Sequence, residues 1–301
     1  MSGSTTDTLA HMDIFLHQLF AGLTSGAIYA SLAVALVMVW RSTHHLNFAQ
    51  GEMAMFSTYV ALALIDAGLG YWSAFALTLA VSFAASIAIE RLIVAPVSRS
   101  QPLATVIVFV ALLSIFHSLA SWLFTPVVRD FPSPFPASIH PGFHYLSGHA
   151  LGVILLTLIE LAAVWSFFRF TRLGLALRAV AQNPESSRLV GIPASQMSAL
   201  GWGLAGALGA LAGMMVAPIV YLDPNMMAGV LLYGFAATLL GGIDNPWGAA
   251  AGGLIVGLLD ALVGTWLVGP ELKLPFALAL IVLVLMAKPS GLFGRATVTR
   301  V

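Results

Sequence analysis

Residues 14–40 read IFLHQLFAGLTSGAIYASLAVALVMVW and contain no Asp, Glu, Lys or Arg. The hydrocarbon core of a bilayer is about 30 Å thick, and one helix needs roughly 20 apolar residues to cross it. This stretch therefore predicts a membrane-spanning helix. Six more segments are apolar in the same way: residues 72–89, 104–124, 151–168, 198–220, 249–268 and 274–287.

The composition of the whole chain agrees with a membrane protein. Of its 301 residues 59% are hydrophobic and only 8% are charged, and the mean hydropathy is +0.97. A soluble domain carries about three times this share of charge. Net charge is zero, so no basic patch indicates a nucleic-acid partner, and the absence of cysteine excludes disulfides, thiol catalysis and cysteine-bound metals.

With the shorter segment 53–65, eight spans are expected in an all-α, polytopic transmembrane bundle. Residues 226–240 form a ninth apolar segment that is short for a crossing, and GGIDNPWG follows at 241–248. Irregular backbone at membrane depth is tolerated only where protein or a water-filled cavity surrounds it. Either this segment crosses and the N-terminus is external, or it is re-entrant; we favour the crossing.

Basic residues predict the orientation of the bundle. Cytoplasmic loops carry an excess of Lys and Arg, and ten basic residues can be placed on one side against two, Arg129 and Lys273, on the other. The ten are Arg41, Arg91, Arg99, Arg169, Arg172, Arg178, Arg188, Lys288, Arg295 and Arg300. We expect a single domain over residues 1–301, with an external polar tail at 1–12, a cytoplasmic loop at 169–197 and a cytoplasmic tail at 288–301.

Small residues recur four positions apart in several apolar segments. Such spacing lets helix backbones approach closely in lipid. We expect helix packing at these sites, with a moving or pore-lining interface as the alternative. Thr24 and Ser25 lie in a predicted Gly-flanked break of the first span and are candidates for a translocation path. The pairs are Gly22 and Gly26, Gly209 and Gly213, Gly248 and Gly252, and Gly253 and Gly257.

The loop at 169–197 contains a local helix signal. Asn183, Pro184 and Glu185 are typical of an N-cap, a first helical position and a first turn. Gly191 is typical of a left-handed helix end, and Pro193 prevents resumption of the helix. We expect a short helix from 184 to about 190. It is either a docking element or part of a basic loop anchored by lipid phosphates.

Other polar residues are candidates for transport chemistry. Asn47, Gln50, Gly51 and Glu52 either cap the second span or line an inner gate. Glu160 and Asp260 lie near the middle of spans, where charge is expensive, so each lies on the solute path or is a neutral carboxyl between helices. His117 is expected to be a packed, neutral imidazole. We find no HExxH, GxSxG or metal-ligand cluster and expect no catalytic residue, metal or cofactor.

Residues 47–52, Asn-Phe-Ala-Gln-Gly-Glu, resemble the Asn-Phe-Ala-His-Gly-Glu signature of LivH-type permeases. These are membrane subunits of bacterial ABC importers for branched-chain amino acids. Residues 22–33, 174–192 and 239–249 resemble the same family, and the resemblance runs from about 14 to 293. Gln50 departs from the usual histidine, which puts any proton-sensitive role there in doubt.

The resemblance implies a permease that does not hydrolyse ATP itself, and the chain has no GxxxxGK[ST] phosphate loop. The implied partners are two ATP-binding subunits, a second LivM-type permease and a periplasmic substrate-binding protein. A coupling helix within 171–193 would meet the ATPase. Its implied contact residues are Arg178, Asn183, Glu185, Arg188 and Gly191.

The implied location is the bacterial inner membrane, and the implied cargo is branched-chain amino acids or related small polar solutes. Urea and short-amide importers have similar permeases, so those solutes stay open. From a different class, an ion-coupled secondary transporter would use Glu160 and Asp260 as its ion sites.

Overall fold

The computed structural model describes residues 3–98, 102–136, 145–267, 269, 272–288 and 290–294. Within these residues the fold is helical, and strand-like pairing is limited to one isolated bridge between Arg129 and Leu222. The elements are α1 (Gly3–Thr43), α2 (Gln50–Asp66), α3 (Tyr71–Ile89), the π-helical η1 (Glu90–Val94), α4 (Ala95–Ser98), α5 (Pro102–Phe124), α6 (Gly148–Phe170), α7 (Arg172–Gln182), α8 (Pro184–Leu189), α9 (Ala194–Val220), α10 (Met226–Gly241), α11 (Pro246–Trp266) and α12 (Lys273–Ala287).

Every expected span is a helix. Six helical segments are long and apolar enough to cross a membrane: those containing α1, α3, α5, α6, α9 and α11. The apolar helices α10 and α12 are shorter, and α2 has 17 residues. The predicted all-α, polytopic bundle is therefore confirmed.

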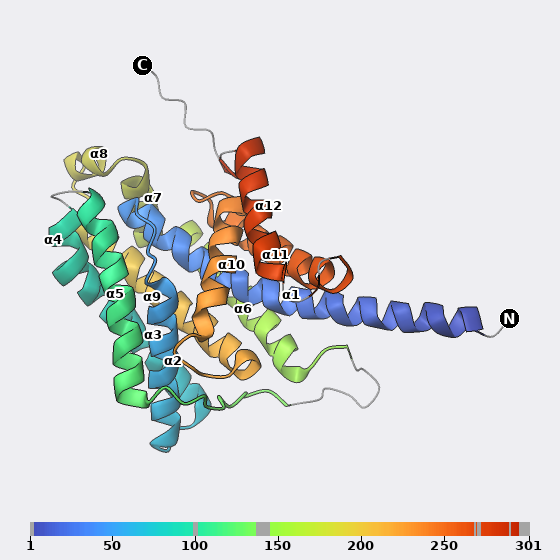
Figure 1. The fold of residues 1–301 in the computed structure, drawn as a ribbon. Helices are drawn as coiled ribbons and strands as arrows, with labels where there is room; N and C mark the ends of the chain where they lie inside the picture. Colours follow the sequence, from blue (N-terminus) through green and yellow to red (C-terminus); the bar gives the residue numbers. More distant parts are fainter. Residues whose placement is uncertain are drawn as a thin grey trace.

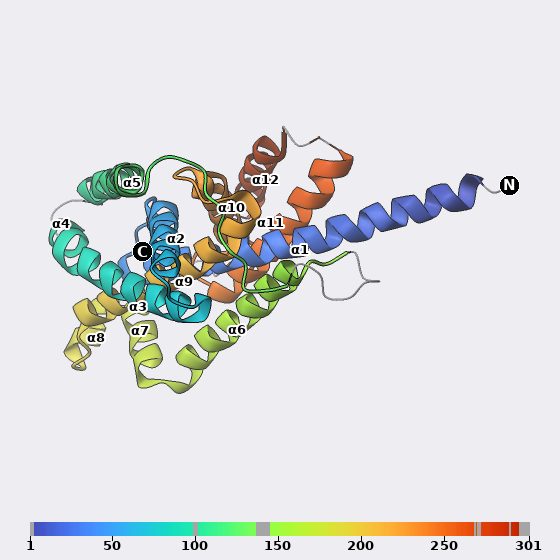
Figure 2. The same ribbon diagram turned by 90° about the horizontal axis from the view of Figure 1, so that it is seen from below.

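Helix α1 runs through the middle of the bundle, and its N-terminal part projects beyond the other helices (Figures 1 and 2). It packs against α6, α9, α10 and α11. The predicted break near Thr24 and Ser25 is wrong, because α1 is continuous from Gly3, inside the expected polar tail, to Thr43. An unbroken helix satisfies its own backbone hydrogen bonds, which lipid cannot do.

The glycines of α1 do not break the helix, and they allow α11 to pack closely against it. A Cβ added to Gly257 would lie 2.3 Å from the Cα of Gly26, and one added to Gly22 would lie 2.9 Å from the Cβ of Ala261. The backbones of α1 and α11 therefore touch along the side that Gly253 and Gly257 present to α1.

The remaining glycine pairs also lie at helix contacts. Gly209 and Gly213 meet the α2 side chains of Gln50 and Thr58, while Gly248 and Gly252 meet α10 near its C-terminal end. The packing prediction is thus confirmed for all four pairs.

The segments on either side of helix α10 contact parts of the chain that are predicted to lie on opposite sides of the membrane. Just before it, Leu222 pairs with Arg129, which belongs to the predicted external loop. Just after it, Asp244 accepts a 2.8 Å hydrogen bond from the indole of Trp40, beside Arg41 at the predicted cytoplasmic end. With those two sides assigned as predicted, α10 would cross the membrane. Its 16 residues are fewer than the roughly 20 that a full span needs, so the crossing stays a prediction.

Helices α3, α5 and α6 lie at the outside of the bundle (Figure 2). They are mostly exposed. Of the most apolar 18-residue stretch in each helix, only 22%, 22% and 33% of the residues are buried in α3, α5 and α6, against 89% in α1. Their outer faces carry large apolar side chains such as Ile107 and Trp122. These faces are suited to lipid or to another membrane subunit.

Candidate functional site

The loop after α6 folds as its sequence predicts. Asn183 caps α8 by accepting a 2.9 Å hydrogen bond from the Ser186 backbone N–H, and Pro184 takes the first helical position. Gly191 has a φ of +85°, the left-handed geometry that ends the segment. The observed helix, Pro184–Leu189, agrees with the predicted 184–190.

Helix α8 protrudes from the bundle beside α7 (Figure 1). Its end is apolar and open, with Leu189 88% and Val190 75% exposed. Glu185 and Arg188 are also exposed, whereas Ser187 is buried and bonds to the carbonyl of Asn183. Exposed apolar side chains ringed by polar ones are typical of a contact surface. The tip can therefore dock into another subunit.

Arg178 occupies a different environment from the exposed tip. It lies half-buried on α7, close enough to Arg41 of α1 for the two cations to repel each other. The five residues of the predicted coupling element thus have separate geometries. Asn183 and Gly191 shape the helix, Glu185 and Arg188 face outward, and Arg178 faces the bundle.

The motif residues 47–52 lead into α2, which begins at Gln50, and all of them except the exposed Phe48 are buried. The Ala49 backbone N–H donates to the Asn47 side-chain oxygen at 3.0 Å, and Asn47 donates to the Gln50 oxygen at 3.1 Å. Gln50 then donates to the Ala205 carbonyl of α9 at 2.8 Å. Asn47 and Gln50 are almost completely buried. Asn47 thus makes a turn just before α2, whose N-cap Ala49 has no side-chain cap, and Gln50 joins α2 to α9. Neither the capping nor the gate interpretation is tested by these contacts.

The other two motif residues contact different helices. Gly51 lies against Leu231 of α10, with room for little more than its hydrogen. A Glu52 carboxylate oxygen lies 3.5 Å from Nδ1 of His117 on α5. His117 is thus not simply packed among apolar side chains, since it faces a buried carboxyl group.

Glu160 and Asp260 do not form one site. Glu160 is 5% exposed and lies beside Ser31 of α1, yet neither oxygen has a hydrogen-bond partner among the described residues. Asp260 accepts a 2.8 Å bond from Tyr233, whose ring stacks on Tyr29 of α1. Two residues of a helix turn through about 200°, so Ser31 and Tyr29 face opposite sides of α1.

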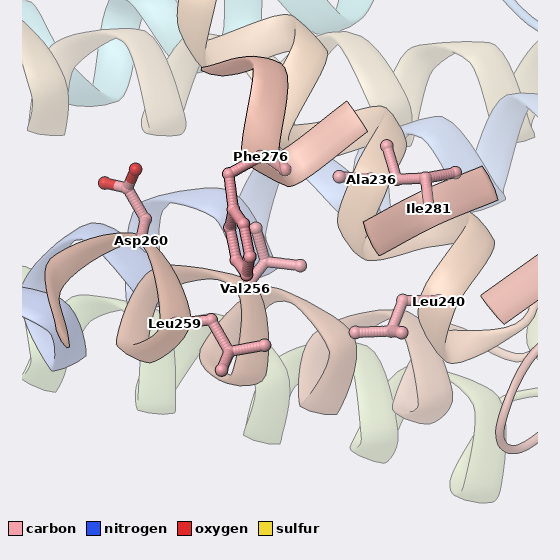
Figure 3. Close-up of a pocket in the computed structure, with 8 residues that line it drawn as sticks. Ala236, Leu240, Val256, Leu259, Asp260, Phe276 and Ile281 are labelled. Atoms are coloured by element: carbon pink, nitrogen blue, oxygen red, sulfur yellow. The ribbon is translucent and has the colours of Figure 1, made fainter. Parts of the chain in front are cut away.

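The cavity next to Asp260 is small and apolar. It lies between α10, α11 and α12 and measures about 10 Å³, room for one water at most. In Figure 3 the Asp260 carboxylate points away from the hydrophobic side chains around the cavity, such as Phe276 and Leu240. This cavity cannot hold an amino acid.

Thr24 and Ser25 are part of the unbroken α1. Thr24 is buried and its hydroxyl donates to the Phe20 carbonyl at 2.9 Å, a bond within its own helix. Ser25 is half-buried. These observations do not place Thr24 or Ser25 at a polar cavity among the described residues. Sequence reasoning missed Tyr233 and Arg41, whose partners lie more than 20 residues away and leave no local signal.

Fold and site together define a polytopic helical membrane protein with a small protruding helix on one long loop. Residues 18–285 match the family described as "Branched-chain amino acid transport system / permease component". The match covers most of the chain, and the chain belongs to this family. It is a multi-pass protein of the inner (cell) membrane.

Two relatives are branched-chain amino acid permeases by name. The high-affinity branched-chain amino acid transport system permease protein LivH of Escherichia coli K12 is 31% identical, over 95% of this chain and 98% of its own length. BraD of Pseudomonas aeruginosa is 29% identical with the same coverage. A solved structure of PsaBC from Streptococcus pneumoniae with a Fab covers 94% of this chain and 95% of its own, with 13% identity and a TM-score of 0.43.

Proposed function

We propose that this chain is the membrane-spanning permease subunit of an ABC importer. It moves branched-chain amino acids or related small polar solutes inward, driven by ATP hydrolysis on partner subunits. The observation that carries this proposal is membership of the permease family over residues 18–285. The proposed partners are two ATP-binding subunits, a second LivM-type permease and a periplasmic substrate-binding protein, with no cofactor on this chain.

The loop geometry suggests how force would reach the spans. Helix α7 begins directly after α6, and Gly174 packs against the backbone of Phe167 and Phe168 at the end of α6. Helix α8 connects through Gly191 and Pro193 to α9. In the proposed mechanism the ATPase grips α8 at Glu185, Arg188 and the apolar tip. Movement of α8 then tilts α6 and α9 and switches the access path.

The competing function is ion-coupled secondary transport through Glu160 and Asp260. Their positions on opposite sides of α1 argue against a shared ion site. We predict that uptake stops when the partner ATPase is inactivated and persists when the proton gradient is collapsed. Replacing Glu160→Gln and Asp260→Asn together is expected to leave at least half of the uptake rate. The amide introduced at position 260 can still accept the Tyr233 bond, and the one at position 160 keeps the shape of a carboxyl group that has no hydrogen-bond partner among the described residues.

The measurement is uptake of labelled leucine in cells that carry the partner subunits, with urea and acetamide as competitors. Competition by urea or the amide, but not by valine, would assign the cargo to the urea and amide class. Loss of uptake on gradient collapse, together with loss in the double variant, would overturn the ABC assignment in favour of the secondary transporter.

A further inference from the structure

Two arginines meet where α1, α6 and α7 converge, at the predicted cytoplasmic end. Arg41 is the third-last residue of α1, and its guanidinium carbon lies 5.2 Å from the ring centroid of Phe168 on α6. Arg178 approaches from α7 and repels Arg41. Both side chains are half-buried, so their mutual repulsion is only partly screened by water.

The neighbouring acidic residue does not neutralise this pair. Asp244 attracts Arg41, but no ion pair within 4.0 Å joins either arginine to a carboxylate among the described residues. One Asp244 oxygen is instead engaged by Trp40. The Nε atom of Arg178 is buried and has no hydrogen-bond acceptor in the described part of the chain. A buried donor without an acceptor is costly, so an acceptor from outside the chain would stabilise this site.

The surroundings indicate what this acceptor is. Trp165 and Phe170, on the same end of α6 as Phe168, are exposed and contact each other, and Leu175 of α7 is 62% exposed. Aromatic and apolar side chains beside basic ones are typical of the level of lipid headgroups. A guanidinium fork also matches the oxygens of a phosphate group.

We propose that Arg41 and Arg178 form a binding site for the phosphate of an acidic phospholipid, between α1, α6 and α7. The lipid would neutralise the pair and hold α7 against α1, at the base of the loop that carries α8. Neither arginine is among the residues expected on the solute path, and the test measures lipid binding and needs no transport activity.

The test uses native mass spectrometry of the purified full chain with phosphatidylglycerol or phosphatidylcholine. The wild-type chain is expected to retain phosphatidylglycerol in preference. Arg41→Gln and Arg178→Gln are each expected to lower this preference roughly fivefold. Arg169→Gln and Arg172→Gln remove the same charge from exposed positions on the same loop and are expected to change it less than twofold.

Thermal unfolding in nanodiscs separates binding from misfolding. In phosphatidylglycerol the Arg178→Gln variant should melt below the wild type. In phosphatidylcholine it should melt at the same temperature or above, because a repulsion is removed.

Three results would overturn the site. The first is that the Arg169 and Arg172 controls lose as much lipid preference as the Arg41 and Arg178 variants, and the second is that inorganic phosphate alone displaces the lipid. The third is that the Arg41 and Arg178 variants keep the lipid but lose binding to the ATPase. The last would assign the anion to an ATPase carboxylate.

Discussion

Gln50 shows how one side chain can join two spans. It occupies the position where resembling permeases carry histidine, and its amide links Asn47 with the Ala205 carbonyl. Its burial was not predictable from the local sequence, because the partner lies 155 residues away. The motif itself was recognisable, but its contacts required the packing of α2 on α9.

Gln50→Met keeps the length of the side chain and removes both hydrogen-bonding groups. Polar contacts between membrane helices are worth about 0.6 kcal/mol on average and up to about 1.7 kcal/mol. We expect this variant to lose about 1 kcal/mol of stability, seen as a lower thermal midpoint in detergent. Gln182→Met on the exposed end of α7 is the control and should melt like the wild type. Equal midpoints for the two variants would contradict the role given to Gln50.

Helix α8 was predictable because its signals are local. Asn183, Pro184 and Gly191 act through backbone geometry within one short segment, so neither distant contacts nor lipid could change the outcome. The burial of Ser187 and the inward position of Arg178 were not predictable. The first depends on how α8 packs against α7 and α9, and the second on how α7 packs against α1.

Gly191→Val tests the turn after α8. A β-branched residue at a φ of +85° is strained, so the helix end should shift and association with the ATPase should fall at least fivefold. Co-purification of the ATPase and its stimulated ATP turnover are the measurements. Gly68→Val is matched, since Gly68 has a φ of +95° and also has open space around it. This control lies between α2 and α3, and its ATPase association should be unchanged.

The contact between α1 and α11 depends on glycine. A Cβ at Gly253 would lie 2.4 Å from the backbone of Ala30, so Gly253→Leu must push two helices apart. Overpacking of this kind costs about 1–3 kcal/mol, and we expect a lower yield of folded protein and a lower thermal midpoint. Gly229→Leu on α10 adds the same side chain where no atom lies within 4 Å. A normal melting curve for the Gly253 variant would show that the contact is dispensable.

The orientation of the whole molecule rests on charge asymmetry and can be tested directly. The chain has no cysteine, so an introduced one is labelled without background. Ser186→Cys on α8 should react with a membrane-impermeant maleimide only after the membrane is opened. Val127 is 64% exposed, and Val127→Cys should react in intact cells. Labelling of Ser186→Cys from outside would reverse the topology and remove α8 from the ATPase side.

Composition and periodic small residues were enough to predict the apolar helices and the packing role of the glycine pairs, but not η1, α4 or α7. In lipid each span must satisfy its own backbone hydrogen bonds, so helix formation follows from an apolar stretch of adequate length. The same rule shows why the expected break in α1 was wrong.

Contacts between distant segments could not be derived this way. The separation of Glu160 from Asp260, the Gln50 bond to α9 and the approach of Arg178 to Arg41 each depend on which faces of the helices meet. The faces of an apolar helix are chemically alike, so the sequence does not say which face packs against a neighbouring helix. In lipid that choice depends on close approach of the backbones and not on the hydrophobic effect. That selection is made by the assembled bundle, because it depends on the shapes of several helices at once.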